Sequence, residues 1–180
     1  SLLVTCGIHK TDLKEIIKFK NHLVINALPE EEYMKDHISE SFNLPVQSIN
    51  PRNRDKKIKS FVKEHVKQLT DIQKSLDSKQ LQFLDIPIVI YCANEECNAS
   101  NKLIQEFNKV GFHNIVDFEG GMKEWNQKHK ISFFEDSESQ ESHEDNKYNL
   151  DIKKEKIIIN GVIYSHNLIN YELYDNENEF

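Results

Sequence analysis

Short apolar runs alternate with helical patterns along the first 130 or so residues of the chain. Two compact runs, at 22–29 and 87–92, predict buried strands, because each is short and sharply bounded. Two further strands are expected in SFNLP (41–45) and NIVDFEGG (114–121). Because helical patterns separate these strands, the chain is predicted to form an α/β fold, a parallel sheet with helices on both faces.

Apolar residues at spacings of three and four predict the helices between those strands. In TDLKEIIKF, Thr11 is the expected cap of the first helix, and Gly111 is the expected end of a helix at Ala99–Val110. The lysine-rich stretch from Asn53 to Phe83 predicts one amphipathic helix or a helix pair. Two short helices complete the set, PEEEYMKDHI (29–38) and MKEWNQKH (122–129).

The pattern changes after residue 133, which we take as the end of a domain spanning 1–133. Residues 134–150 are acidic and serine-rich with few aliphatics, which predicts a flexible linker. In the extension 151–180, Asn160-Gly161 separates two β-prone runs and predicts a hairpin. A lone hairpin is marginal in water, so we expect it to dock on the first domain, to bind a protein partner or a second copy of the chain, or to stay partly disordered.

Composition narrows the function classes. The net charge of −7 disfavours a nucleic-acid partner, and no run reaches the roughly 18 apolar residues of a membrane span. The opening SLLVTCG is too short for the apolar core of a signal peptide. Three irregularly spaced cysteines fit neither a disulfide framework nor a four-ligand zinc site, and the eight histidines are scattered. We therefore expect a reducing, cytoplasmic compartment, no membrane partner, no metal and no cofactor.

The loop that follows the strand IVIYC is the candidate for chemistry. Cys92 ends the strand at the carboxyl edge where parallel sheets place their ligand sites. A loop that curls its backbone N–H groups inward ahead of a helix forms an anion site, which would stabilise a thiolate at its base. Cys92 is thus predicted to be a nucleophile.

Three separated motifs, in order, resemble the rhodanese-like domain family over about His9 to His129. They are LVINALPEEEYMKDHISESFNLP, IVIYCANEECNAS and GFHNIVDFEGGMKEW. The family includes sulfurtransferases, the catalytic domain of certain dual-specificity phosphatases, and inactive binding versions. The resemblance implies a catalytic Cys92 that accepts sulfane sulfur as a persulfide and passes it to a thiol or another nucleophile. It also implies that the loop binds the donor through the backbone of Ala93, Asn94, Glu95, Glu96, Cys97 and Asn98.

Two departures from the family pattern bear on the substrate. Asn26 and Leu28 stand where many active members have Asp and Arg, and the loop carries Glu95 and Glu96 in place of basic residues. Two carboxylates near a thiolate would raise its pKa and repel thiosulfate, by about 1 kcal/mol per charge if solvated. We therefore expect a protein persulfide, or a neutral or basic small molecule, as the donor. Phosphatase activity is disfavoured because no arginine lies between Cys92 and Ser100.

Other residues have simpler interpretations. Cys97 is a candidate resolving thiol, although a small half-buried residue near the helix start is the more common case. Cys6 lies outside every motif, His37 is expected to order its turn, and Trp125 to anchor the last helix by packing.

Two function classes stay open. One is a sulfurtransferase that carries sulfur on Cys92; the other is a catalytically weak or inactive binding or regulatory module. In the second, the fold serves as a scaffold for the acidic linker and hairpin. The acidity and exposure of Cys92 separate them.

Overall fold

The computed structural model describes residues 6–127, 156–159 and 162–165. The chain forms two compact units, Ser1–Trp125 and Asn126–Phe180, and each is described by itself. The predicted domain end at residue 133 and the predicted acidic linker at 134–150 lie outside the described residues, so both remain predictions.

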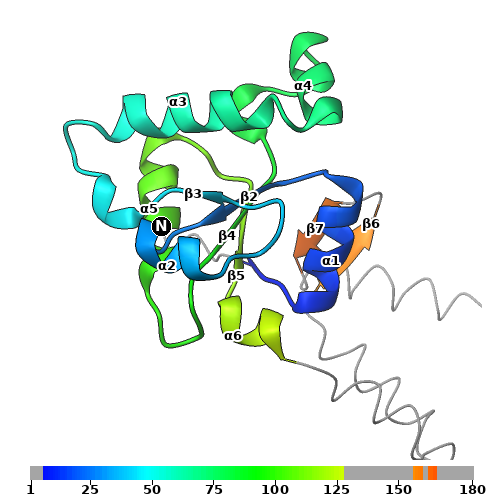
Figure 1. Cartoon of the computed structure of the whole chain (residues 1–180). Coiled ribbons are helices and arrows are strands. Elements are labelled where there is room, and N and C mark those ends of the chain that lie inside the picture. The colour runs from blue at the N-terminus through cyan, green and yellow to red at the C-terminus, as the bar shows by residue number, and fades with distance from the viewer. Residues whose placement is uncertain (1–5, 128–155, 160–161, 166–180) are drawn as a thin grey trace, which may run out of the picture. The chain divides into compact units, whose positions relative to one another are not determined.

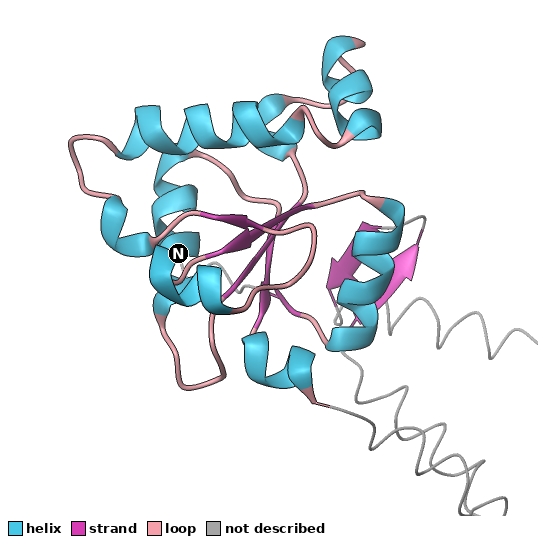
Figure 2. Ribbon diagram, viewed as in Figure 1, coloured by secondary structure: helices cyan, strands magenta, loops and turns pink. Residues whose placement is uncertain are grey.

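A five-stranded parallel sheet in the order β1-β5-β4-β2-β3 forms the centre of the first unit (Figures 1 and 2). Its strands are β1 (Cys6–Gly7), β2 (Leu23–Asn26), β3 (Phe42–Asn43), β4 (Ile88–Tyr91) and β5 (Ile115–Phe118). All four residues of β4 are buried, and β4 pairs along its length with β2 and β5. The predicted buried strands and parallel sheet are confirmed, and β4 takes the middle position.

The helices between these strands are α1 (Lys10–Phe19), α2 (Glu30–Lys35), α3 (Arg54–Val66), α4 (Thr70–Asp77) and α5 (Ala99–Val110), and α6 (Gly121–Asn126) follows β5. Two 3-10 turns, η1 (Val46–Ser48) and η2 (Phe83–Asp85), lie between them. The lysine-rich stretch forms a helix pair, α3 and α4. α5 has the predicted bounds and ends at Gly111 in the left-handed conformation.

The predicted cap of the first helix is wrong. His9 occupies the N-cap position, and Thr11 lies inside the first turn. The Asp12 carboxylate, from within the helix, accepts a hydrogen bond from the His9 backbone N–H (2.9 Å), and the Glu124 carboxylate of α6 accepts one from the Lys10 N–H (2.6 Å).

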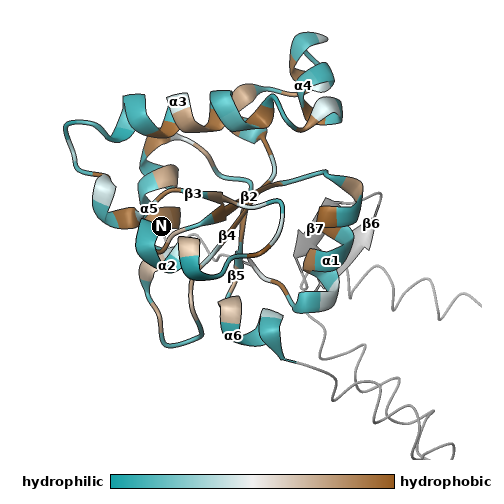
Figure 3. Cartoon of the chain, in the orientation of Figure 1, coloured by the Kyte–Doolittle hydropathy of each residue, from teal (hydrophilic) through white to brown (hydrophobic). Residues whose placement is uncertain are grey.

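Helices cover both faces of the sheet. On one face, α3 and α5 bury aliphatic and aromatic side chains against alternate residues of β2 and β4, in one core cluster. Figure 1 shows α1 and α6 on the side of the sheet opposite α3. α1 buries Leu13 and Ile16. Colouring by hydropathy shows the result: apolar residues concentrate on the strands, while α3 exposes a polar outer side (Figure 3).

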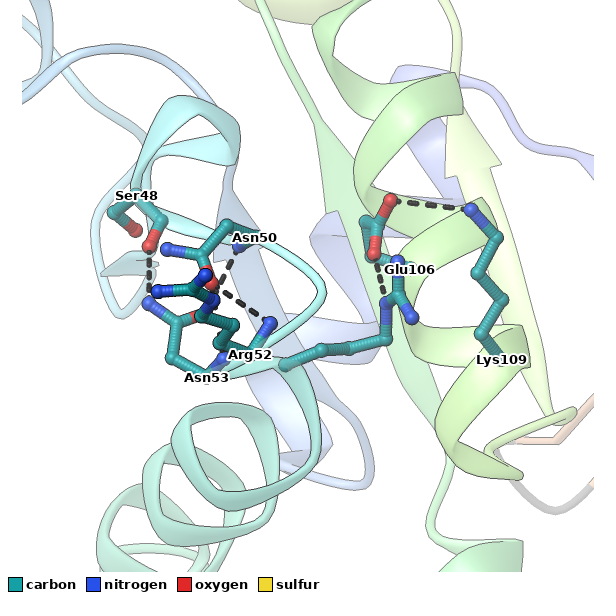
Figure 4. Close-up of polar contacts among 7 residues, drawn as sticks. Ser48, Asn50, Arg52, Asn53, Glu106 and Lys109 are labelled. Carbon is teal, nitrogen blue, oxygen red and sulfur yellow. Dashed lines mark hydrogen bonds and ion pairs between the residues drawn. The ribbon is translucent and has the colours of Figure 1, made fainter.

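Polar contacts fix the start of α3 and join it to α5 (Figure 4). Asn53 donates to the Ser48 carbonyl (3.0 Å), and the Asn50 side chain accepts from the Asn53 N–H (3.0 Å). Arg54, the first residue of α3, pairs with Glu106 on α5, and Lys109 pairs with the same carboxylate at 3.3 Å. These contacts hold α5, the helix that follows the Cys92 loop, against α3.

The second unit contains an antiparallel strand pair, β6 (Lys156–Ile159) and β7 (Val162–Ser165). Ile158 lies opposite Ile163, and Ile159 lies opposite Val162. The predicted turn at Asn160-Gly161 lies outside the described residues.

Candidate functional site

Cys92 lies directly after β4, at the carboxyl end of the central strand. Its side chain is 2% exposed, beneath the loop that leads to α5. The Sγ atom lies 3.5 Å from both the Cys97 carbonyl oxygen and the Ser100 hydroxyl, and its single S–H can donate to either acceptor. The structure therefore places Cys92 where the sequence predicts the nucleophile, held between its own loop and the first turn of α5.

Asn94 organises the loop. Its side-chain oxygen accepts hydrogen bonds from the backbone N–H groups of Glu96 and Cys97, each at 3.0 Å. The Asn94 carbonyl also accepts from the Cys97 N–H, at 3.1 Å. Two of the N–H groups expected to contact the sulfur donor are therefore bonded within the loop.

The amino end of α6 holds the other side of the loop. The N–H groups of Met122 and Lys123 donate to the carbonyls of Cys92 (3.0 Å) and Ala93 (2.9 Å). Gly121 makes this approach possible, because a Cβ there would lie 2.3 Å from the Cys92 carbonyl oxygen. Its φ of 56° also lies in the left-handed region that favours glycine. Gly121, from the third motif quoted in the sequence analysis, thus shapes the base of the site.

The acidity of Cys92 differs from the sequence-based expectation. Burial raises the pKa of the Cys92 thiol, and its hydrogen bond with Cys97 raises the pKa further. The hydroxyl and the N–H of Ser100 act in the opposite direction, but they do not outweigh burial. Cys92 is therefore a protonated, buried thiol before sulfur binds, and the expected lowering of its pKa is not found. By the acidity and exposure that were expected to separate the two function classes, this observation taken alone favours the binding module.

Cys97 is the more acidic thiol of the loop. Burial by itself would raise the pKa of Cys97, but hydrogen bonds outweigh it and lower the pKa below its ordinary value. They come from the Cys92 thiol and from the backbone N–H groups of Ala93 and Ala99. The N–H groups of Ala93 and Ala99 therefore stabilise the half-buried Cys97 sulfur, which is the more acidic of the two.

The remaining loop residues lie at the surface. Glu95, Glu96 and Asn98 are exposed, while Ala93 and Asn94 are partly buried. Glu95 and Glu96 are not among the groups that shift the pKa of Cys92. We expected these carboxylates to raise the pKa of Cys92, but burial is the main cause of the rise.

Two buried polar residues beside the thiols were not anticipated. Ser100, in the first turn of α5, is 2% exposed, and Asp117, in the middle of β5, is 3% exposed. Burial raises the pKa of Asp117 to about 6, and Glu119 also raises it, while the Ser100 hydroxyl lowers it. A charged residue inside the apolar run NIVDF is the signal that could have revealed Asp117 from the sequence.

Asn26 and Leu28 form a polar turn at the end of β2. The Asn26 side chain is fully buried, and its oxygen accepts from the Leu28 N–H (2.8 Å). Asn43 donates to the Leu28 carbonyl (2.8 Å). The residues that replace the family's Asp and Arg therefore stabilise the chain's own backbone.

His37 and Trp125 make the contacts expected of structural residues. The His37 ring stacks on Tyr33 with 3.9 Å between centroids, and its Nδ1 lies 2.8 Å from the Tyr33 carbonyl. Trp125 is half-buried, with the Lys10 ammonium 5.6 Å from its ring centroid.

The part of the chain that the structure describes contains no group of three metal-ligating side chains. No helix within that part has the length and apolar character to cross a bilayer.

Comparison with known proteins identifies the family. The sequence profile of the Rhodanese-like domain matches residues 9–128, two thirds of the chain. The chain belongs to the rhodanese-like domain family. Strands β2 to β5 of the parallel sheet, the Cys92 loop and the Gly120-Gly121 turn lie inside this rhodanese-like domain, and β1 directly precedes it. No curated protein sequence matches the chain significantly.

Several solved structures are similar to this rhodanese-like chain. A single-domain sulfurtransferase of Saccharomyces cerevisiae is 14% identical, with 69% of this chain and 91% of that chain covered and a TM-score of 0.48. A human single-domain sulfurtransferase is 13% identical, with coverage of 71% and 100% and a TM-score of 0.47. A rhodanese-related protein of Thermoplasma volcanium is 24% identical, with coverage of 67% and 89% and a TM-score of 0.41.

Proposed function

We propose that this chain is a sulfurtransferase that carries sulfane sulfur as a persulfide on Cys92 and passes it to an acceptor thiol. The observation that carries the proposal is the placement of Cys92 in a rhodanese-like domain. The thiol ends the central strand, and its Sγ lies in contact with Ser100 under a loop that contains a second thiol. Such a position protects a bound sulfur from water while leaving the loop as its route of entry and exit.

Transfer takes two displacement steps. In the first, the Cys92 thiolate attacks the outer sulfur of the donor, the Cys92 Sγ–S bond forms, and the donor leaves as its own thiolate. In the second, an acceptor thiolate attacks the outer sulfur of the persulfide, which transfers that atom and returns Cys92 as a thiolate. Each step exchanges one sulfur–sulfur bond for another, or its equivalent in the donor, so no external oxidant or reductant is needed.

The donor class follows from the surface of the loop. Glu95 and Glu96 are exposed, and residues 93–98 include no lysine or arginine. The two charged side chains of this loop are both negative, so they repel a dianion such as thiosulfate but not a neutral persulfide or a protein persulfide with a basic surface. We infer that the donor is a persulfide of this kind.

We propose a second route for the Cys92 persulfide, in which Cys97 acts as the resolving thiol. Its lowered pKa and its hydrogen bond with Cys92 favour attack by the Cys97 sulfur on the Cys92 persulfide. Attack of Cys97 on the Cys92 Sγ forms a Cys92–Cys97 disulfide and releases hydrosulfide. An external dithiol must then reduce the disulfide, so this route yields sulfide when no acceptor thiol arrives.

The test is sulfur loading resolved by peptide mass. The protein is incubated separately with thiosulfate, mercaptopyruvate and a low-molecular-weight alkyl persulfide, and the peptides that contain Cys6, Cys92 and Cys97 are weighed. We expect one added sulfur atom on the Cys92 peptide, most completely from the alkyl persulfide. The Cys92→Ser variant is expected to load none, and Cys6→Ser serves as the matched control that loads normally. A protein that gains no sulfur from any donor is the binding module, and the proposal fails.

Two variants test the details of the site. Cys97→Ser is expected to hold the Cys92 persulfide longer and to release less sulfide in the absence of acceptor; equal release would exclude the resolving role. The double change Glu95→Gln and Glu96→Gln is expected to increase loading from thiosulfate by roughly 10-fold, since two charges of about 1 kcal/mol each are removed and screening reduces the total. No gain would remove the charge argument for the donor class.

A further inference from the structure

Asp117 is a buried carboxyl group beside the thiols that the transfer steps leave unused. It lies on β5 opposite Ile90 of β4, two residues before Cys92. Because side chains alternate along a strand, Ile90, Asp117 and Cys92 point to the same face of the sheet. The Asp117 side chain is 3% exposed, and its Oδ1 has no hydrogen-bond partner among the described residues. Burying a carboxylate oxygen without a hydrogen-bond partner costs free energy, so its presence calls for an explanation.

Ser100 interacts with both Asp117 and Cys92. Its hydroxyl is 3.5 Å from the Cys92 Sγ and acts as a hydrogen-bond donor toward the Asp117 carboxyl. A hydroxyl has one proton to donate and two lone pairs to accept with. Ser100 can therefore donate to the ionised carboxylate while it accepts from the Cys92 S–H, or donate to a Cys92 thiolate while it accepts from a protonated Asp117, but it cannot donate to both anions.

We propose that Asp117 accepts the proton of Cys92 through Ser100 when the nucleophile forms. This inference rests on the proposed function, because it assumes that Cys92 attacks the donor. The Cys92 S–H bond breaks as its proton moves to the Ser100 oxygen, and the Ser100 O–H proton moves to the Asp117 carboxylate. One proton and one negative charge exchange places, and Ser100 ends with its hydroxyl directed at the Cys92 sulfur.

Charge counting favours this route over simple loss of the proton to solvent. With Asp117 ionised, a Cys92 thiolate would add a second negative charge to the same buried space, in addition to any charge on Cys97. The relay keeps the total unchanged, since the carboxylate becomes neutral as the thiolate forms. The pKa of Asp117, raised to about 6 by burial and by Glu119, leaves it ionised at neutral pH and able to accept the proton.

Asp117 and Ser100 can also return the proton to Cys92. When an acceptor thiolate removes the outer sulfur, Cys92 is left as a thiolate and Asp117 still holds the proton. Return of that proton through Ser100 restores the resting thiol. Asp117 is thus a positioning and proton-holding residue that acts on Cys92 through Ser100.

The test is the pH dependence of Cys92 alkylation by a neutral reagent, measured peptide by peptide in a Cys97→Ser background so that one thiol is observed. We expect a rise with a midpoint near the Asp117 titration, at about pH 6, followed by a plateau and a second rise as Cys92 ionises. Asp117→Asn is expected to lose the first rise and to lower the plateau rate by at least about tenfold. Ser100→Ala is expected to do the same with Asp117 in place, whereas Ser100→Thr, which keeps the hydroxyl, restores the rise.

A second measurement covers the case in which Asp117→Asn does not fold. Infrared difference spectra on loading Cys92 with sulfur at neutral pH are expected to show a protonated carboxyl band in the otherwise unmodified protein, and Ser100→Ala is expected to lack it. No band on loading, or a first rise that persists in Asp117→Asn and Ser100→Ala, overturns the relay. Loading that proceeds normally with either result leaves the proposed function intact, whereas absence of loading overturns the proposed function itself.

Discussion

Substituting Gly121 with alanine is expected to destabilise the domain strongly and to disturb Cys92 directly. The new Cβ would lie 2.3 Å from the Cys92 carbonyl oxygen and 2.8 Å from the Ala93 carbonyl carbon, both backbone atoms that cannot rotate away. Overpacking of this kind costs about 1–3 kcal/mol. The φ of 56° adds roughly 1–2 kcal/mol for a residue with a Cβ. The free energy of unfolding should therefore fall by about 2–5 kcal/mol.

Gly7→Ala is the matched control for this change. There the Cβ would contact only the Glu119 side chain, at 3.2 Å, and that exposed side chain can move. Chemical denaturation followed by circular dichroism gives the free energy of unfolding of each variant, and Gly7→Ala should stay within about 1 kcal/mol of the parent protein. Gly121→Asn separates the two causes, because asparagine tolerates the left-handed conformation but keeps the Cβ contact. A Gly121→Ala protein as stable as Gly7→Ala would refute the close approach between Gly121 and the Cys92 loop.

The remaining predictions concern stability and pH. Burial lowers the pKa of His22 to about 4, so its contribution to stability, about 3 kcal/mol, is present above pH 6.5 and is lost as the pH falls toward 4. Burial raises the pKa of Asp117 to about 6, so stability from that group falls by about 3 kcal/mol as the pH rises from 3.8 to 6. The contributions of His22 and Asp117 therefore change the free energy of unfolding in opposite directions as the pH falls from about 6.5 to 4. Measured by chemical denaturation over this pH range, Asp117→Asn should lose stability on acidification and His22→Gln should gain it. If the two variants showed the same pH dependence, both pKa shifts would be contradicted. Arg54→Met should lower the free energy of unfolding by about 1–2 kcal/mol above pH 4.5 and by less below it. The hydrogen bond from Arg54 lowers the pKa of Glu106, so the ion pair is lost as that carboxylate is protonated. A loss of stability that does not depend on pH would show that packing of the Arg54 stem, rather than its charge, stabilises the domain.

Local patterns carry most of the information about the fold. β4 and α5 could be predicted because an apolar run and a helical spacing ended by Gly111 depend only on neighbouring residues. The start of α1 could not be predicted in this way, because the Glu124 carboxylate, 114 residues away, accepts a hydrogen bond from the Lys10 N–H at 2.6 Å. A contact between distant parts of the chain, together with Asp12, made the helix begin one residue before Thr11.

Some features of the candidate site could likewise be predicted from the sequence, and others required the structure. Cys92 and the loop after it could be located from their order in the sequence, because a strand followed by a helix fixes where the loop emerges. The distribution of acidity between Cys92 and Cys97 depends on which sulfur the N–H groups of Ala93 and Ala99 approach, and no spacing in the sequence encodes that. The proximity of Asp117 required the register of β5 against β4.

The measurement that tests sulfur transfer most directly is a single-turnover chase. Protein loaded with one sulfur on Cys92 is freed of donor and mixed with an acceptor thiol, and the Cys92 peptide and the acceptor persulfide are followed together by mass. The account predicts that the sulfur leaves Cys92 at the rate at which the acceptor persulfide appears, and that Cys92→Ser gives no acceptor persulfide. Sulfur that stays on Cys92 in the presence of acceptor, or acceptor persulfide formed equally well by Cys92→Ser, would contradict it.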